Sequence, residues 1–379
     1  MGEAGKRQNV LQAGVIGTGF IGIVQIDSIR RIPGIRLAAV CEALPERLWE
    51  VKERYGIEKG YTDWRELIGD PEIQVVHNCT PGILHDEINR AAILAGKHIY
   101  SEKPLSLSAG GAKELWRLAV EHRVAHGVNH QYRLYAAVQE MRARLRDGEG
   151  GRPLFVSGCY LQETAARQTD YTPRRMPEDS PARALSDIGI HWADAACFVM
   201  GQPVRAVYAQ MYTHYSMRRD PVTGKEIEIR SDDTTSVMVR FEDGTPGMAI
   251  FSKCMLGHKN DMIVTVSGEA REYTWKQRNG DRLYIGNRES GNEELYMGPE
   301  LVHEEVRSCL SLPPGHAMGW QDALTYAIEI FYDSIRSGSY LTGPVPYATF
   351  YDGWRGNAFI EACVESAKTD CWVELEKLP

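Results

Sequence analysis

The sequence predicts two domains of different construction: a parallel α/β domain, then an α+β domain with a large, mostly antiparallel open sheet. Its 379 residues exceed the usual length of one domain, and 43% hydrophobic with 25% charged residues is typical of a folded globular chain. In the first part, apolar runs alternate with amphipathic stretches, whereas later strand-like runs follow one another across tight turns. We therefore divide the chain into domains at 1–130 and 131–379.

The first domain is expected to consist of βαβ units. Its apolar runs are mostly continuous rather than alternating, as in a sheet that is covered on both faces. The expected strands are residues 12–17, 36–41, 74–80, 97–101 and 124–128, and the helices between them are 21–31, 45–55, 84–95 and 108–122. A further helix is expected at 134–146, before the glycine-rich stretch 147–153.

The second domain is expected to be α+β, because most of its strand-like runs have no helix-length segment between them. The expected strands are residues 154–161, 205–213, 234–241, 247–254, 262–268, 271–277 and 282–287. The expected helices are residues 185–200, 318–336 and 347–367.

A glycine-rich segment joins the first expected strand to the first expected helix. Residues 14–22 read GVIGTGFIG, and a G-x-G-x-x-G pattern in this position is typical of a dinucleotide-binding Rossmann domain. Its glycines permit the tight turn, close backbone approach to a pyrophosphate and close helix packing, and the helix start offers N–H groups to the anion. A purely structural turn is the alternative. The expected cofactor contacts here are Gly17, Thr18, Gly19, Phe20 and Ile21.

An acidic residue at the end of the second expected strand indicates which dinucleotide is bound. Glu42 lies 25 residues after Gly17, where a carboxylate can accept hydrogen bonds from both ribose hydroxyls and repel a 2′-phosphate. This position favours NAD over NADP. Two alternatives stay open, because Arg47 could bind a phosphate and Glu42 could be a solvated acid at a helix start.

Lys103 follows the fifth expected strand, within Tyr100-Ser101-Glu102-Lys103-Pro104. Ligands of open α/β sheets bind beyond the carboxyl ends of the strands, so Lys103 is expected at the cofactor crevice. A lysine beside a nicotinamide can hydrogen-bond a substrate hydroxyl and make it more acidic. A solvated surface charge is the alternative.

Asp187 and His191 lie four residues apart on an otherwise apolar expected helix and so share one face, as Asp187 and Asp194 do. Oxidation of a secondary alcohol needs a base for the hydroxyl proton while hydride leaves carbon, and histidine titrates near neutral pH. The two residues are therefore the expected catalytic pair. A helix cap at Asp187 beside a core histidine is the alternative.

Together these segments resemble the Gfo/Idh/MocA family over nearly the whole chain. The resemblance implies that Lys103 contacts both substrate and nicotinamide, that Asp187 and His191 form the catalytic pair with His191 as proton acceptor, and that Lys103 and His191 converge over one nicotinamide. The matching stretches are AGVIGTGFIG (13–22), VVHNCTPGILHDE (75–87), AGKHIYSEKPLSLS (95–108), GVNHQYRL (127–134), DIGIHWAD (187–194) and DGWRGNAFIEACVESAKT (352–369). Further cofactor contacts implied by the family are Thr80, Pro81, His85, Glu102, Lys103, Asn129 and Gln131.

Three later segments resemble a sugar-oxidising branch of this family that includes levoglucosan dehydrogenase and the glycoside 3-dehydrogenases. They are residues 257–277, 285–290 and 312–323. The branch implies oxidation of a ring hydroxyl, with C3 of a pyranoside as the expected position, to a ketone. Hydroxyl-rich ligands favour planar polar groups and aromatic faces, although ordinary packing is the alternative for each candidate. The candidate sugar contacts are Arg133, Tyr160, Gln162, His316 and Trp320.

Composition limits the partners. The eight cysteines contain no close-spaced pair, so we expect no metal and no disulfide framework, and the net charge of −8 disfavours nucleic acid. We find no apolar run of membrane-spanning length and no secretory signal, which predicts a cytoplasmic protein that acts on a small neutral sugar or polyol. Apolar and aromatic residues on both alternations of strands such as 205–215 predict a homodimer or homotetramer packed through the sheet.

Three functions remain to be separated. An NAD-dependent sugar or glycoside dehydrogenase is favoured, and use of the redox step for glycoside cleavage stays open. The second is an inositol dehydrogenase or an NADPH-dependent keto-sugar reductase. The third is a cofactor-binding regulatory protein without turnover, against which the joint presence of Lys103, Asp187 and His191 argues.

Overall fold

The computed structural model describes residues 10–171 and 182–377, which form two compact units. The first unit contains the chain up to residue 131 together with 321–354, and the second contains 132–320 and the residues from 355 onward. The sequence predicts 321–354 in the second domain, so the structure differs there. Among the described residues, no helix is long and apolar enough to cross a membrane.

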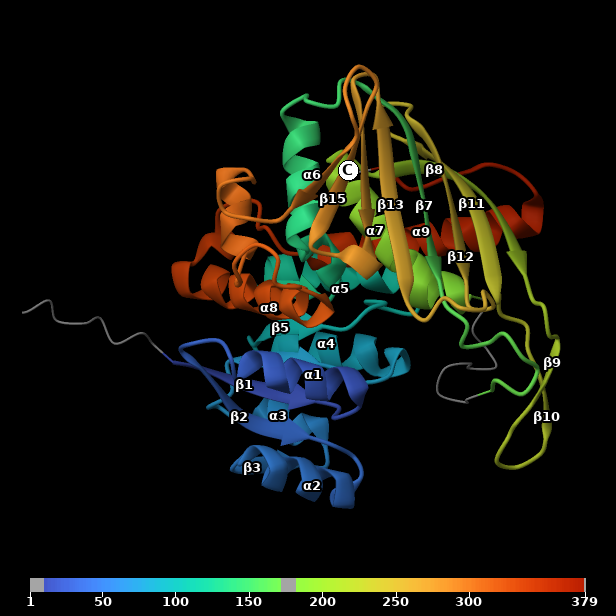
Figure 1. Cartoon of the computed structure of the whole chain (residues 1–379). Coiled ribbons are helices and arrows are strands. Elements are labelled where there is room, and N and C mark those ends of the chain that lie inside the picture. Colours follow the sequence, from blue (N-terminus) through green and yellow to red (C-terminus); the bar gives the residue numbers. More distant parts are fainter. Residues whose placement is uncertain (1–9, 172–181, 378–379) are drawn as a thin grey trace, which may run out of the picture. The chain divides into compact units, whose positions relative to one another are not determined.

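The first unit is built on six parallel strands in the order β3-β2-β1-β4-β5-β6 (Figure 1). This order is typical of a Rossmann fold, and it places β1 between the two halves of the sheet, where the strand order reverses. The strands are β1 (Leu11–Ile16), β2 (Ile35–Cys41), β3 (Lys59–Tyr61), β4 (Val75–Asn78), β5 (His98–Ser101) and β6 (His126–Val128). The predicted parallel domain is therefore confirmed, with β3 as an additional short strand.

Helices follow most of these strands. Side chains cap two of them: Ser108 accepts from the backbone N–H of Gly111 at 3.0 Å, and Asp63 accepts from that of Arg65 at 2.9 Å. The helices of this unit are α1 (Phe20–Ile29), α2 (Pro45–Tyr55), α3 (Trp64–Gly69), α4 (His85–Leu94), α5 (Ala109–Glu121) and α8 (Trp320–Ser337). The short helix α3 was not predicted.

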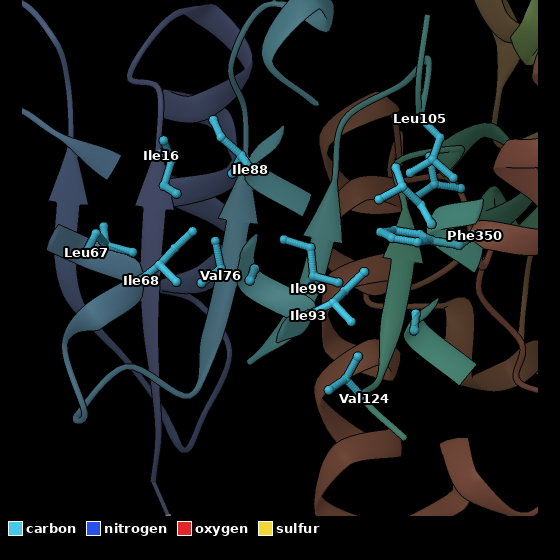
Figure 2. Close-up of a cluster of buried hydrophobic side chains, with 14 of the residues drawn as sticks. Ile16, Leu67, Ile68, Val76, Ile88, Ile93, Ile99, Leu105, Val124 and Phe350 are labelled. Carbon is cyan, nitrogen blue, oxygen red and sulfur yellow. The ribbon is translucent and has the colours of Figure 1, made fainter. Parts of the chain in front are cut away.

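Residues 321–354 belong to the first unit because they complete its core. Phe350 and Trp354 are buried in the same hydrophobic cluster as strand residues such as Val76 and Ile99, and Figure 2 shows Phe350 beside Leu105. Polar contacts add to this packing, since the backbone N–H of Phe350 donates to Nδ1 of His126 at 3.1 Å. Burial of apolar area is the main stabilising term in folding, so this late segment is part of the first unit's structure.

The second unit contains a nine-stranded sheet in the order β16-β15-β14-β13-β7-β12-β11-β8-β17. Strands β7 and β12 pair in parallel, and the other neighbouring strands of this sheet pair antiparallel, which confirms the predicted α+β class. Its strands are β7 (Pro153–Leu161), β8 (Val204–Tyr212), β11 (Thr234–Phe241), β12 (Pro246–Ser252), β13 (Asp261–Gly268), β14 (Arg271–Lys276), β15 (Arg282–Asn287), β16 (Glu293–Tyr296) and β17 (Val373–Glu374). A separate small sheet holds β9 (Met217–Arg219) and β10 (Glu226–Glu228).

Helices cover one face of this sheet (Figure 1). Helix α7 (Ile190–Met200) lies against β7 and β13, and the indole N–H of Trp192 donates to the carbonyl of Ile263 at 3.1 Å. Helix α6 (Ala136–Arg146) packs on β14 and β15, while α9 (Phe350–Thr369) is divided between the two units after Trp354. The helix expected at 185–200 begins instead with a π-helical turn, Leu185–Gly189, which carries Asp187. Such turns often occur at functional sites.

Candidate cofactor and active site

The loop between β1 and α1 has the geometry that a pyrophosphate requires. Gly17 adopts φ 88°, which favours glycine, and a Cβ on Gly22 would lie 2.0 Å from the carbonyl oxygen of Gly17. The backbone is therefore compact at this turn, which leads directly into the N-terminus of α1, where an anion is favoured. Thr18 is buried, whereas Phe20 is 75% exposed in the first turn of the helix. The loop fits the dinucleotide that its sequence predicts.

Glu42, directly after β2, is hydrogen-bonded to this loop. Its Oε2 accepts from the backbone N–H and the hydroxyl of Thr18 at 3.1 Å and 2.8 Å. Burial raises the pKa of Glu42, but the hydrogen bonds from Thr18 and the neighbouring backbone outweigh it and hold the pKa below its usual value. Arg47 is also close, donating to the carbonyl of Thr18 at 3.1 Å. An ionised acceptor at this position suits the ribose of NAD.

Glu102 and Asn129 follow β5 and β6 at the carboxyl end of the sheet. Oε1 of Glu102 accepts from the side-chain amides of Asn129 at 2.6 Å and Gln25 at 2.8 Å, and burial raises the pKa of this carboxyl. Lys103 is half-buried in the turn that follows Glu102, and Gln131 is buried in the turn that follows Asn129. These four predicted residues therefore lie beyond the strand ends, as expected.

His85 connects two loops beyond the sheet. Its Nδ1 is 2.6 Å from the carbonyl oxygen of Pro104, and its Nε2 is 2.9 Å from that of Thr80. The ring is 1% exposed, and burial lowers its pKa. Thr80 is itself held by its hydroxyl, which donates to Oδ1 of Asn78 at 2.7 Å, and Pro81 is exposed beside it. The ring therefore bridges the loops that contain Thr80 and Pro104, and its contact with the cofactor stays a prediction.

In the second unit, Asp187 forms an ion pair with Lys253, which follows the end of β12. The Lys253 side chain is 4% exposed and the Asp187 side chain 49% exposed, so a buried ammonium supports a carboxylate that faces solvent on this chain. An ammonium in an ion pair with a carboxyl favours the ionised form of that carboxyl. Lys253 was not predicted, because a single lysine after an apolar strand carries no distinctive spacing.

A group of hydroxyl and amide side chains lies beside His191. The imidazole is 4.9 Å from the ring of Tyr132, and the Tyr132 hydroxyl is 2.6 Å from that of Tyr160. Oδ1 of Asn260 accepts from the Tyr160 hydroxyl at 2.7 Å and from the amide of Gln162 at 2.8 Å. Burial, with Tyr132 and Asp187 nearby, raises the pKa of Tyr160 well above its usual value, so its hydroxyl stays protonated. Tyr160 and Gln162 were predicted, whereas Tyr132 and Asn260 were missed.

The other three candidate sugar contacts have different surroundings. Arg133 is buried, and its Nε donates to Oδ2 of Asp194 at 2.9 Å, so its guanidinium is engaged by a carboxylate of α7. His316 lies in an exposed loop with its Nδ1 3.2 Å from the carbonyl oxygen of Pro313. Trp320 is the half-buried first residue of α8. The contacts of Arg133, His316 and Trp320 with a sugar therefore stay predictions.

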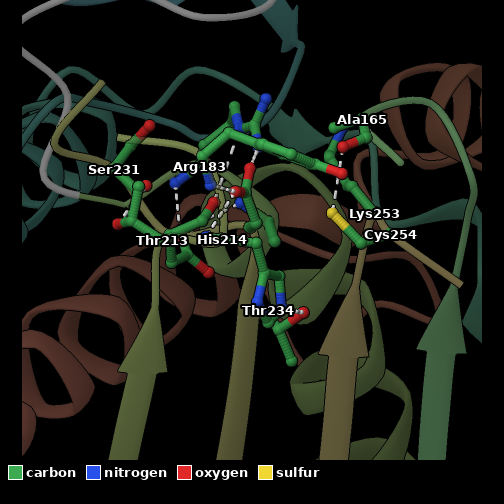
Figure 3. Close-up of polar contacts among 12 residues, drawn as sticks. Ala165, Arg183, Thr213, His214, Ser231, Thr234, Lys253 and Cys254 are labelled. Carbon is green, nitrogen blue, oxygen red and sulfur yellow. Dashed lines mark hydrogen bonds and ion pairs between the residues drawn. The ribbon is translucent and has the colours of Figure 1, made fainter. Parts of the chain in front are cut away.

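A buried ionic cluster holds the segment that carries Asp187 (Figure 3). Asp233 is paired with both Arg183 and Arg218, and the three side chains are at most 2% exposed. Asp232 accepts from the backbone N–H groups that open the π-helical turn, including Ala184 at 3.0 Å. The backbone N–H of Lys253 donates to the carbonyl of Asp233 at 2.9 Å. The cluster therefore fixes the backbone on both sides of the Asp187–Lys253 pair.

Comparison with known proteins agrees with these two units. A family model described as the oxidoreductase family with an NAD-binding Rossmann fold, Gfo/Idh/MocA, matches residues 11–130, and a Gfo/Idh/MocA C-terminal domain model matches residues 138–274.

Among individual relatives, levoglucosan dehydrogenase of Pseudarthrobacter phenanthrenivorans is 28% identical over 97% of this chain and 99% of its own length. Inositol 2-dehydrogenase of Pseudomonas fluorescens is 28% identical over 96% of both chains. A solved structure of levoglucosan dehydrogenase with NADH and L-sorbose has a TM-score of 0.90 over 97% of this chain and 99% of that one. The fold, the NAD-type glycine loop and both matching models lead to one assignment: the chain belongs to the Gfo/Idh/MocA family of NAD-binding oxidoreductases.

Proposed function

We propose that this protein is an NAD-dependent dehydrogenase that oxidises a secondary ring hydroxyl of a sugar or glycoside, at C3 of a pyranoside, to a ketone. The observation that carries the proposal is the group beside His191. There, a titratable base lies next to two tyrosine hydroxyls, and Asn260 and Gln162 extend the group. Uncharged hydrogen-bonding side chains with aromatic rings suit a neutral, hydroxyl-rich ring. The full-length similarity to levoglucosan dehydrogenase supports the same substrate class.

In this proposal each catalytic residue has one task. When bound, NAD⁺ accepts the hydride from the carbinol carbon. His191 accepts the hydroxyl proton, so that the alcohol loses one hydride and one proton and becomes a ketone. Asp187, which is paired with Lys253, stabilises the imidazolium that forms. Lys103 donates a hydrogen bond to the substrate oxygen, as the family resemblance implies.

Two measurements test the proposal. Purified protein is incubated with NAD⁺ and a panel of pyranosides, aldoses and inositols, and NADH formation is followed by absorbance. We expect turnover with a pyranoside, and products are analysed to identify the oxidised carbon. His191→Asn should abolish turnover while NADH affinity stays near the wild-type value, whereas the exposed His122→Asn is the matched control. Unchanged turnover in His191→Asn would remove this histidine from the mechanism.

Inositol oxidation is the second candidate. It is supported by the inositol 2-dehydrogenases, which match 96% or 97% of this chain at 24–28% identity. The same panel separates the two functions, because each predicts NADH formation with a different ring. A steady low level of NADH with cleaved product would instead indicate that the redox step serves glycoside hydrolysis.

We also propose that a second copy of the chain covers the face of the large sheet opposite α7. Met238 and Met248 are paired across β11 and β12, so their side chains share a face, and Ile250 follows on the same alternation. These side chains are 44%, 47% and 37% exposed. A row of exposed apolar residues on a wide sheet is typical of a protein–protein interface.

A further inference from the structure

A chain of buried hydrogen bonds crosses the first unit from α8 to the end of β5. The Tyr332 hydroxyl is 2.9 Å from Nε2 of His77, Nδ1 of His77 is 2.7 Å from Oε1 of Gln25, and Nε2 of Gln25 is 2.8 Å from Oε1 of Glu102. Tyr332, His77 and Gln25 are fully buried, and Glu102 is 6% exposed. Tyr332, His77 and Gln25 are not among the residues predicted from the sequence, and none of them belongs to the glycine loop or to a strand end described above.

The direction of each hydrogen bond follows from the groups at the two ends of the chain. Burial lowers the pKa of His77 to about 3, so the ring is neutral and carries one N–H. The amide of Gln25 faces a carboxylate oxygen that already accepts from Asn129 at 2.6 Å, so Gln25 must present its N–H there and its carbonyl oxygen to His77. Nδ1 of His77 therefore carries the hydrogen, and Nε2 accepts from the Tyr332 hydroxyl. Every donor points toward Glu102.

Hydrogen bonds that run in the opposite direction are disfavoured at the Tyr332 hydroxyl. They would need a protonated Glu102, a turned Gln25 amide and an N–H on Nε2 of His77 that donates to the Tyr332 oxygen. The Tyr332 hydroxyl would then need a new acceptor, and within residues 10–171 and 182–377 His77 is its hydrogen-bond partner. An unsatisfied buried hydroxyl is costly. The hydrogen bonds thus have a preferred direction, which is determined by the Tyr332 hydroxyl on α8.

We propose that Tyr332, His77 and Gln25 are positioning residues of the cofactor site, whose one-directional hydrogen bonds hold Glu102 as an ionised acceptor for a hydroxyl of the nicotinamide ribose. The inference rests on the proposed contact of Glu102 with the cofactor. Two further groups face Glu102 electrostatically: Lys103, which favours its ionised form, and the buried Cys79 thiol. Burial raises the pKa of Glu102, and the donors from Asn129 and Gln25 oppose that rise.

The sign of the expected pH effect follows. If the chain is broken, the pKa of Glu102 rises further, and the acceptor is lost as the pH falls through that higher value. Binding of NADH then weakens at low pH and recovers at high pH. A rise of one unit corresponds to a change of up to about tenfold in affinity.

The test compares NADH dissociation constants at about pH 6 and about pH 8, measured by NADH fluorescence, which needs no substrate. The wild type should change by less than about twofold between the two pH values, whereas Tyr332→Phe and Gln25→Met should weaken by about fivefold or more at the lower pH. Tyr347→Phe is the matched control, because it removes another buried hydroxyl of this unit, bonded to Ser334 at 2.9 Å and outside the chain.

Glu102→Gln separates the two possible failures. If it binds NADH like the wild type at both pH values, the cofactor does not need an ionised carboxylate at this position and the premise is wrong. If Glu102→Gln binds weakly while Tyr332→Phe and Gln25→Met keep the wild-type pH ratio, the contact stands and the role of the hydrogen-bond chain is refuted. A pH effect of the same size in Tyr347→Phe would also refute it, because the effect would then be general loosening.

Discussion

Replacing Asp233 with asparagine should strongly destabilise the second unit. The two carboxylate oxygens of Asp233 have different partners. Oδ1 accepts from the guanidinium groups of Arg183 and Arg218, the latter at 2.8 Å. Oδ2 accepts from the backbone N–H groups of His214 at 2.8 Å and Tyr215 at 3.3 Å. Asparagine keeps the shape of the carboxylate but replaces one of its two acceptor oxygens with an NH2 group, which can only donate. Whichever way its amide turns, an N–H must face N–H donors.

The expected cost follows from burial. The Arg183, Arg218 and Asp233 side chains are at most 2% exposed, so solvent cannot screen the charges that lose their partner. Burial and the charge of Arg218 already lower the pKa of Arg183 to about 10, which shows how unfavourable its environment is for a cation. Removing one member of a buried ion pair costs about 3–5 kcal/mol, because the remaining charge stays buried and uncompensated.

The assay is urea unfolding followed by tryptophan fluorescence, with the free energy of unfolding compared between variants. Glu228→Gln in the same unit is the matched control: it makes the same change of charge in an exposed pair with Arg230, where side-chain exposures are 60% and 76%. That change should cost at most about 1 kcal/mol. A loss below about 1 kcal/mol for Asp233→Asn would refute the assignment of the cluster as a structural anchor.

Substitutions at three further positions probe the site and the assembly. Lys253→Met should lower turnover by about tenfold or more, because Asp187 loses its partner, whereas Lys253→Arg should retain most of the turnover. Both are measured by steady-state kinetics with the substrate found by the panel, and equal rates in all variants would show that the pair is unimportant. Glu42→Ala should raise kcat/KM with NADP⁺ relative to NAD⁺, since Arg47 remains beside the loop, and an unchanged ratio would contradict the role of Glu42. Met248→Lys should convert the oligomer to the 42.6 kDa monomer in light scattering, and a wild-type chain that is already monomeric would disprove the proposed interface.

The regular elements of the fold were predictable because each is encoded locally. The continuous apolar runs that predict the parallel strands match β1, β2, β4, β5 and β6 to within a few residues. The strand β3 and helix α3 were missed because 3 and 6 residues are too few to show a period. Helix α8 was predicted as a helix, but its amphipathic pattern does not state which unit its apolar face covers.

Site residues were predictable only where a recognisable motif lies within a short segment of the sequence. The glycine loop and Glu42 follow strands whose ends the sequence locates, whereas Glu102, Tyr160 and Gln162 came from the family resemblance. Lys253 and Tyr332 are different, because each acts through a partner that is far away in sequence: 66 residues separate Lys253 from Asp187, and 255 separate Tyr332 from His77. The sequence also does not reveal that the guanidinium of Arg133 is paired with the buried carboxylate of Asp194.

The division of the first unit into 10–131 and 321–354 has a consequence for how it can be made. A gene fragment that stops at residue 131 would omit Phe350 and Trp354, leave their contact surface in the core open to water, and remove the hydroxyl that orients His77. During synthesis on the ribosome, the nucleotide-binding half cannot be finished until residues 132–354 have been translated, although its six strands emerge first. A single-chain fragment intended to bind NAD should therefore join 10–131 to 321–354 through a linker.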